Sequence, residues 1–262
     1  MGLKTPAKPS VTYVYCLVAA DRRPRVRAAV SGLPGAGPVR LLDVADGLFM
    51  AVADVPGDRY DESAISSGLS KLDWVSRIAV AHEGVVESFA SASAVLPMKL
   101  FTIFTNDDRA MAHMHTQRAR LAALVKRVAH HQEWGVRVAM DRERASAALS
   151  KNSSARAVTG ATYLAQKKAQ RDASRELASR ARETVAGLFD RLAAGSRDAK
   201  RRAASELSAP AGPLLLDAAF LVPRTRALRF RKSAAREAKM LSRQGYDLTL
   251  TGPWPPYTFV QG

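Results

Sequence analysis

The sequence has very little cysteine and no long apolar run. Cys16 is the single cysteine among 262 residues, so an intramolecular disulfide is impossible and a disulfide-stapled secreted scaffold is excluded. One thiol also cannot supply a zinc site. No stretch approaches the roughly 18 consecutive apolar residues that a membrane-spanning helix requires. We therefore expect no membrane span and a reducing compartment, the cytoplasm.

The N-terminal residues admit two interpretations. Lys4 and Lys8 precede residues 11–20, an order that resembles a short signal peptide. Thr12 and Tyr13 interrupt the apolar run, however, and β-branched and aromatic residues suit a strand. The composition of this segment favours the strand.

Acidic side chains are scarce relative to basic ones. There are 24 Asp and Glu against 40 Lys and Arg, a formal net charge of +16. Such an excess either faces an anionic partner or keeps the protein from associating with itself. Apolar residues make up 47% of the chain, which is enough for a core. The length suggests two domains.

The charge is unevenly distributed along the chain. Residues 1–150 carry 19 basic and 15 acidic side chains, residues 151–206 carry 13 and 6, and residues 207–262 carry 8 and 3. The middle segment is rich in Ala, Arg, Lys and Ser and poor in large apolar residues, which predicts a solvated helix. We therefore predict an N-terminal domain over 1–150, a basic helical connector over 151–206 and a smaller α+β domain over 207–262.

Five extended segments are expected in the N-terminal domain. Residues 11–18, 39–44 and 48–55 read as strands, and Asp46-Gly47 predicts a tight hairpin between the second and the third. Residues 95–104 are extended but broken by a proline. Alternation over residues 133–140 predicts a last strand of this domain.

Two helices are expected between these strands. The first begins near Asp73, and its core-facing residues recur at helical spacing: Trp74, Ile78, His82, Val85 and Phe89. The second is capped by Asn106, with an apolar face that runs to Val128. Together the elements predict an α+β fold, a ferredoxin-like antiparallel sheet with helices on one face.

The C-terminal domain ends in an unusual tail. Residues 214–222 and 246–251 read as strands around a basic helix over 226–243 that Gly245 ends. After the last strand, prolines forbid both a helix and a central strand. This predicts an extended tail whose aromatic rings need a surface to pack against. The candidate partner-binding residues are Trp254, Pro255, Pro256, Tyr257 and Phe259. The alternative is that these rings hold the chain end on the protein's own second domain.

The histidines give no metal site. His113 and His115, like the adjacent His130 and His131, lack the three- or four-residue spacing of a helical metal site. His82 lies within the apolar stripe and reads as a buried histidine, with a catalytic base as the alternative. No phosphate-binding glycine loop or nucleophile motif is present. We expect no catalytic, metal-binding or cofactor-binding residues and no cofactor.

Nucleic-acid binding is the main alternative for so basic a chain, whose sequence pI is near 10.5. The basic middle segment, however, has almost no interleaved aromatic residues beyond Tyr163 and Phe189. No helix-turn-helix, zinc-finger or RNA-binding signature accompanies it. Specific nucleic-acid recognition is therefore disfavoured.

Six blocks of the sequence resemble, in order, those of the gas vesicle GvpF/GvpL family. The most distinctive is the closing segment LTGPWPPYTF at residues 250–259. The others are DWV with AH (73–75, 81–82), VLPM with FTIF (95–98, 101–104), EWGVRV (133–138), GATYL with KK (160–164, 167–168) and DAAFLV (217–222). One departure is local: the family often has Arg-Phe-Gly-Thr where this chain has KLFT at residues 99–102.

The resemblance implies a two-domain α+β fold and a non-enzymatic role in building gas vesicles. Family members are minor components or assembly factors that contact the small hydrophobic shell protein, and other accessory proteins are possible partners. A factor that covers an apolar shell face before assembly needs an exposed apolar or aromatic docking surface. The resemblance places the protein in the cytoplasm, associated with the gas vesicle.

Overall fold

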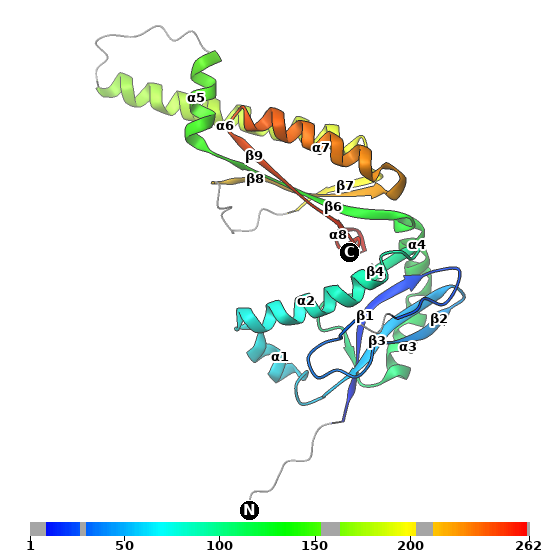
Figure 1. The fold of residues 1–262 in the computed structure, drawn as a ribbon. Helices are drawn as coiled ribbons and strands as arrows, with labels where there is room; N and C mark the ends of the chain where they lie inside the picture. The colour runs from blue at the N-terminus through cyan, green and yellow to red at the C-terminus, as the bar shows by residue number, and fades with distance from the viewer. Residues whose placement is uncertain (1–8, 27–29, 153–162, 203–211, 261–262) are drawn as a thin grey trace, which may run out of the picture. The chain divides into compact units, whose positions relative to one another are not determined.

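The computed structural model describes residues 9–26, 30–152, 163–202 and 212–260 of the chain. The chain forms two compact units (Figure 1). Unit 1 comprises Met1–His131 together with Pro255–Gly262, and unit 2 comprises Gln132–Trp254. The chain thus passes from one unit to the other twice.

Unit 1 is built on an antiparallel sheet in the order β2-β3-β1-β4, with β5 also paired to β1. Its strands are β1 (Val11–Ala19), β2 (Arg40–Ala45), β3 (Leu48–Val55), β4 (Ala94–Pro97) and β5 (Ile103–Phe104). The predicted hairpin is present between β2 and β3, and Gly47 at its turn has φ +66°. Glycine adopts this left-handed conformation without the penalty that a Cβ brings.

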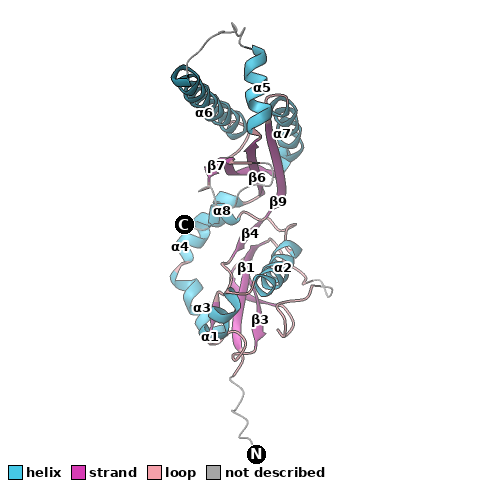
Figure 2. Ribbon diagram, turned by 90° about the vertical axis from the view of Figure 1, so that its left-hand side faces the viewer, coloured by secondary structure: helices cyan, strands magenta, loops and turns pink. Residues whose placement is uncertain are grey.

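Helices cover both faces of the central strand of unit 1. They are α1 (Glu62–Leu69), α2 (Leu72–Ser88), α3 (Asp107–Thr116), α4 (Arg118–Val128) and the short α8 (Tyr257–Val260). Tyr13 faces α2, whereas the Thr12 hydroxyl donates to Asp107 at the start of α3 (2.7 Å). Successive side chains of a strand point to opposite faces, and Figure 2 shows α2 and α3 on opposite sides of β1.

The predicted α+β class with antiparallel pairing is confirmed, but two details differ. The helices lie on both faces of the sheet rather than on one, because β1 is buried along nearly its whole length and needs cover on each side. The second predicted helix is two helices, since the chain breaks at Gln117 between α3 and α4. Asn106 caps α3 as expected, accepting from the Arg109 N–H at 2.9 Å.

Unit 2 has a second sheet in the order β7-β8-β6-β9. Its strands are β6 (His131–Met140), β7 (Asp198–Arg201), β8 (Leu214–Pro223) and β9 (Tyr246–Trp254). The helices are α5 (Arg142–Asn152), α6 (Tyr163–Ala193) and α7 (Ala227–Ser242), which follows a short 3-10 turn η1 (Arg224–Arg226). Helices α6 and α7 contact each other and β8, and with the inward faces of the strands they enclose the core of this unit.

The structure divides the chain at other points than the predicted 150 and 206. Strand β6 was expected in the N-terminal domain, but it pairs with β9 and belongs to the second sheet. The C-terminal part of α6 departs from the predicted solvated connector, because four of its residues are buried in the unit 2 core: Ala181, Val185, Leu188 and Leu192. Most of the described side chains between Lys167 and Arg180 are exposed, as predicted. Most of the 160–164 block of the resemblance lies outside the described residues.

Candidate functional site

The C-terminal tail, predicted to bind a partner, is mostly packed inside the protein. Pro255 and Pro256 are buried, and Phe259 is 1% exposed. The tail is not extended throughout, since residues from Tyr257 form α8, which contacts β4 and α4 of unit 1. The expectation that these rings hold the chain end on the second domain is therefore corrected for Tyr257 and Phe259, which lie in α8 and pack on the first unit.

Two residues of the tail are less buried. The hydroxyl of Tyr257 donates to the Glu83 carboxylate at 2.5 Å, and its ring packs at the edge of the unit 1 core. Burial, together with the hydrogen bond to Glu83, raises the Tyr257 pKa above its ordinary value. Trp254, at the end of β9, is 40% exposed and is the one tail ring that a partner can reach extensively.

His82 lies in the core of unit 1 and is 2% exposed. Its Nδ1 is 2.8 Å from the Tyr13 hydroxyl, which accepts a hydrogen bond from the Phe101 N–H and can therefore donate its own proton to the imidazole. Burial lowers the His82 pKa to about 4, opposed in part by a backbone hydrogen bond with Met98. This geometry favours the structural interpretation of His82 over a catalytic base, because a substrate has no access to the ring.

Other candidate reactive groups are equally unsuited to chemistry. Cys16 is fully buried, and burial raises the pKa of its thiol, which keeps it protonated and unreactive. His113, His115 and His130 are exposed. Within the ranges that the structure describes, no three His, Cys, Asp or Glu side chains are grouped so that they could hold a metal ion. Of the helices in the same ranges, none combines the length and apolarity needed to cross a membrane.

The most exposed large apolar side chains of unit 1 lie along α1 and α2. We call Leu69, Leu72 and Val80 the apolar face; they are 56%, 79% and 73% exposed. Val80 also lines a shallow, mainly apolar groove of about 570 Å³ between α2 and residues 30–32. Its α2 wall includes Ala81 and Gly84, and a Cβ added at Gly84 would meet nothing within 4 Å.

The apolar face was missed from the sequence because the core stripe of α2 dominated its pattern. Leu72 and Val80 are eight residues apart, which places them about a quarter turn from each other around the helix, both away from Ile78 and His82. Two large aliphatic residues on the polar side of an otherwise amphipathic helix were the available signal.

The α1–α2 corner that presents the apolar face is fixed by close packing. The Trp74 ring stacks on Phe101 with centroids 5.5 Å apart and an interplanar angle of 7°. Trp74 also covers Gly68 so closely that a Cβ there would lie 2.5 Å from its ring. Any larger residue at position 68 would therefore displace the indole and the corner with it.

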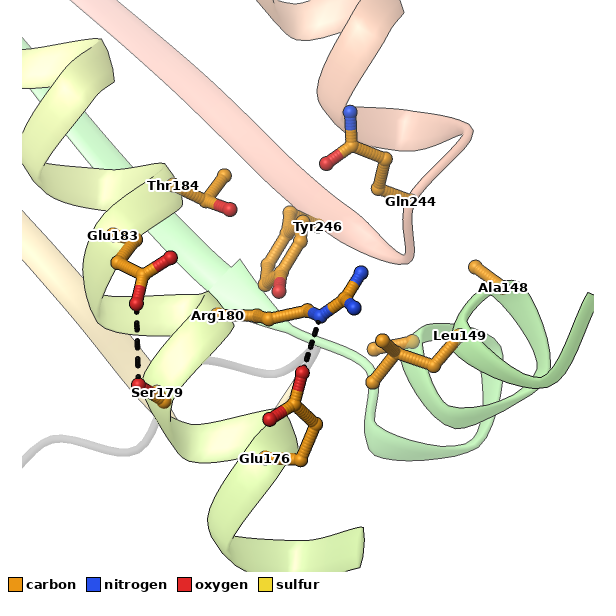
Figure 3. Close-up of a pocket in the computed structure, with 10 residues that line it drawn as sticks. Ala148, Leu149, Glu176, Ser179, Arg180, Glu183, Thr184, Gln244 and Tyr246 are labelled. Atoms are coloured by element: carbon orange, nitrogen blue, oxygen red, sulfur yellow. Dashed lines mark hydrogen bonds and ion pairs between the residues drawn. The ribbon is translucent and has the colours of Figure 1, made fainter. Parts of the chain in front are cut away.

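Unit 2 contains a separate pocket of about 430 Å³ between α5, α6 and the start of β9 (Figure 3). Figure 3 shows Glu176 and Arg180 paired across one turn of α6, at 2.7 Å, and Ser179 bonded to Glu183. Tyr246 forms part of the wall. The charged groups that line this pocket therefore already have partners on the same helix.

Comparisons with known proteins identify the relatives of this chain. The family model described as "Gas vesicle synthesis protein GvpL/GvpF" matches residues 11–261. Gas vesicle protein L of Streptomyces sp. (strain CB03234) is 29% identical over 258 residues, which cover 95% of this chain and 92% of that protein.

Two crystal structures of gas vesicle proteins share the fold. GvpF from Anabaena sp. PCC7120 aligns with a TM-score of 0.69 at 18% identity, over 96% of each chain. GvpF from Microcystis aeruginosa aligns with a TM-score of 0.67 at 14% identity, over 96% of this chain and 99% of that one. The α+β architecture predicted from the sequence is the one found in these structures.

Proposed function

The chain belongs to the gas vesicle synthesis protein GvpL/GvpF family, and from that premise we propose that it is a non-enzymatic assembly factor that contacts the hydrophobic shell protein. It acts in the cytoplasm, in association with the forming gas vesicle, and needs no cofactor. The observation that carries this proposal is the apolar face of α1 and α2 with the groove beside it.

Before assembly, a free shell subunit exposes an apolar surface to water. A wall that excludes water must present a broad apolar surface, and a free subunit with such a surface would aggregate. Leu69, Leu72 and Val80 offer a complementary surface on two helices whose corner is held rigid by the Trp74–Phe101 stack. A rigid docking surface loses little conformational entropy when it binds.

The tail contributes to the same function in a narrower way than its composition suggests. Phe259 and the two prolines are committed to the unit 1 fold. Of the five predicted residues we keep Trp254 as a direct contact, since its ring has exposed area to bury. Pro255, Pro256, Tyr257 and Phe259 support binding by anchoring the chain end.

The proposal is tested by co-purification with a tagged shell protein. We expect the double variant L72D/V80D to reduce the bound fraction about tenfold or more. Binding would remove the charge of each aspartate from water and place it against an apolar surface. The matched control is A119D/A123D, which adds the same two charges at exposed positions of α4 in the same unit. Trp254→Ala tests the tail, and we expect a smaller loss.

Three outcomes contradict the proposal. If the chain does not retain the shell protein at all, the contact does not exist. If L72D/V80D and A119D/A123D weaken binding equally, added negative charge rather than the apolar face is responsible. Binding of L72D/V80D at the unaltered level, with loss only in Trp254→Ala, would move the contact to the tail.

A further inference from the structure

A second candidate site lies in unit 2, where α6 ends and α7 begins. A pocket of about 320 Å³ is lined there by the last residues of α6, the turn at Ala194 and Gly195, and one face of α7. Arg226, the last residue of η1, is followed by Arg229, Ser233 and Arg236 of α7 at spacings of three, four and three residues. We call this the arginine pocket.

The acidic residue of α7, which lies next to the lining residue Arg236 in the sequence, is already neutralised. Glu237 is 7% exposed and receives two hydrogen bonds from Arg191, at 2.7 and 2.9 Å. This pair raises the Arg191 pKa, with the charge of Asp190 adding to the effect. In the described part of the chain, no carboxylate pairs with Arg226, Arg229 or Arg236, so three full positive charges line the pocket without an internal partner.

Helix dipoles do not compensate these charges. The α6 C-terminus at the pocket carries roughly half a negative charge, and the α7 N-terminus carries roughly half a positive one, so the two nearly cancel. The first turn of α7 contains no acidic residue, although this is where acids are most favourable. Arginines at that end of a helix cost stability, and an anion bound between them would offset the cost.

We propose that the arginine pocket binds a carboxylate-rich segment of a protein partner, held by Arg226, Arg229 and Arg236. Guanidinium groups bind carboxylates through paired hydrogen bonds, and the half-buried Ser233 hydroxyl adds a donor. The volume is near the lower end of the range of about 300–1,000 Å³ typical of ligand pockets. An acidic segment differs chemically from the apolar surface of the shell protein. This inference therefore does not depend on the proposed contact with the shell protein.

The features of the pocket favour an acidic peptide over a nucleic acid. Nucleic-acid grooves follow a run of phosphates and offer exposed rings on which bases stack. The aromatic residue of this pocket, Phe230, is 4% exposed and packs into the unit 2 core, so it offers no stacking surface. The arginines form one compact cluster, which suits one or two neighbouring carboxylates.

The test measures binding of a fluorescent hexaglutamate peptide to the full chain by fluorescence anisotropy at near-physiological salt. The pocket variant is R226Q/R229Q/R236Q. The matched control is R231Q/K232Q/R243Q, which removes three charges at exposed positions of the same helix region outside the pocket. Hexaglutamine, inorganic phosphate and mixed-sequence single-stranded DNA serve as competitors.

We expect the pocket variant to bind hexaglutamate about tenfold more weakly or worse, and the control variant within about threefold of the unaltered chain. Neither variant should unfold at a lower temperature than the unaltered chain, since all six side chains are exposed. Equal weakening in both variants, or no binding by the unaltered chain, would overturn the proposal. Stronger competition by DNA or phosphate than by unlabelled hexaglutamate, abolished in the pocket variant, would reassign the pocket to phosphates.

Discussion

The imidazole of His82 packs against two neighbouring tyrosine rings, with centroids 5.8 Å from Tyr13 and 5.6 Å from Tyr15. The helical period of α2 predicts that His82 is buried. It cannot predict the hydrogen bond to Tyr13, which comes from a strand 69 residues away. Burial of His82 follows from local periodicity, whereas its partner depends on the tertiary fold.

The lowered pKa of His82 makes stability depend on pH. Its folded value of about 4 lies below the ordinary 6.5. As the pH falls from about 6.5 to about 4, the unfolded chain takes up a proton that the folded chain does not, so the free energy of unfolding decreases by up to about 3 kcal/mol. Urea unfolding at a series of pH values measures this decrease.

The control for this pH effect is His82→Asn, which removes the titrating group. The variant is less stable at pH 7, but its free energy of unfolding should fall less steeply between pH 6.5 and 4.5. Carboxylates titrate in both proteins and cancel in the comparison. Identical slopes for the two proteins would show that His82 does not titrate in this way.

Phe101 has a backbone conformation that the sequence does not reveal. Its φ is +64°, in the left-handed region that glycine adopts most easily. This is the third position of KLFT, where the resembling family often has glycine. The stacking of Phe101 on Trp74 offsets part of the conformational cost, which is about 1–2 kcal/mol for a residue with a Cβ.

Helices and strands with a long, regular apolar pattern were predictable from the sequence, and those with few apolar residues were not. Strand β3 has the predicted bounds. Helix α2 begins one residue before the expected Asp73, and α7 begins one residue after and ends one residue before the expected range 226–243. The apolar stripe of α6, formed by Leu177, Ala181, Val185, Leu188 and Leu192, was missed although its spacing is helical, because it lies within a highly charged segment. Strand β7 was missed because three of its four residues are charged.

The tail shows why composition alone misplaced an element. The prolines predict an extended segment. The chain is extended as far as Trp254, and a proline is tolerated there because β9 is an edge strand of its sheet. Beyond Pro256, however, the chain turns into α8, and no local signal shows which unit will bury its rings.

The packing of α8 leads to a prediction about stability. Phe259→Ala should lower the free energy of unfolding of unit 1 by about 3–5 kcal/mol, because it leaves a cavity where a fully buried ring was. Trp254→Ala, at a 40% exposed position, should cost at most about 1 kcal/mol. Denaturant unfolding followed by far-ultraviolet circular dichroism compares the two. A larger loss in Trp254→Ala than in Phe259→Ala would contradict the placement of α8.

In the whole molecule, the two units are not consecutive stretches of the sequence. Residues 132–254 form one unit, and the last residues return to the other. A sequence read from end to end suggests consecutive domains, because pairing of β6 with β9 joins segments more than a hundred residues apart. The net charge is also divided unequally: residues 132–254 contain 24 basic and 12 acidic side chains.

The two candidate surfaces give the units different chemistry. Unit 1 carries the apolar face, which suits a hydrophobic shell subunit, and unit 2 carries the arginine pocket, which suits an acidic segment. An assembly factor with two such surfaces can hold two different proteins without altering either of them covalently.

The central claim is that this chain covers the apolar surface of the shell protein before assembly. Light scattering of purified shell protein, diluted from denaturant in the presence of increasing amounts of the chain, tests it most directly. We expect scattering to fall as the chain approaches equimolar amounts, and L72D/V80D to suppress it far less than A119D/A123D does. Undiminished scattering with the unaltered chain, or equal suppression by the two variants, would contradict the claim.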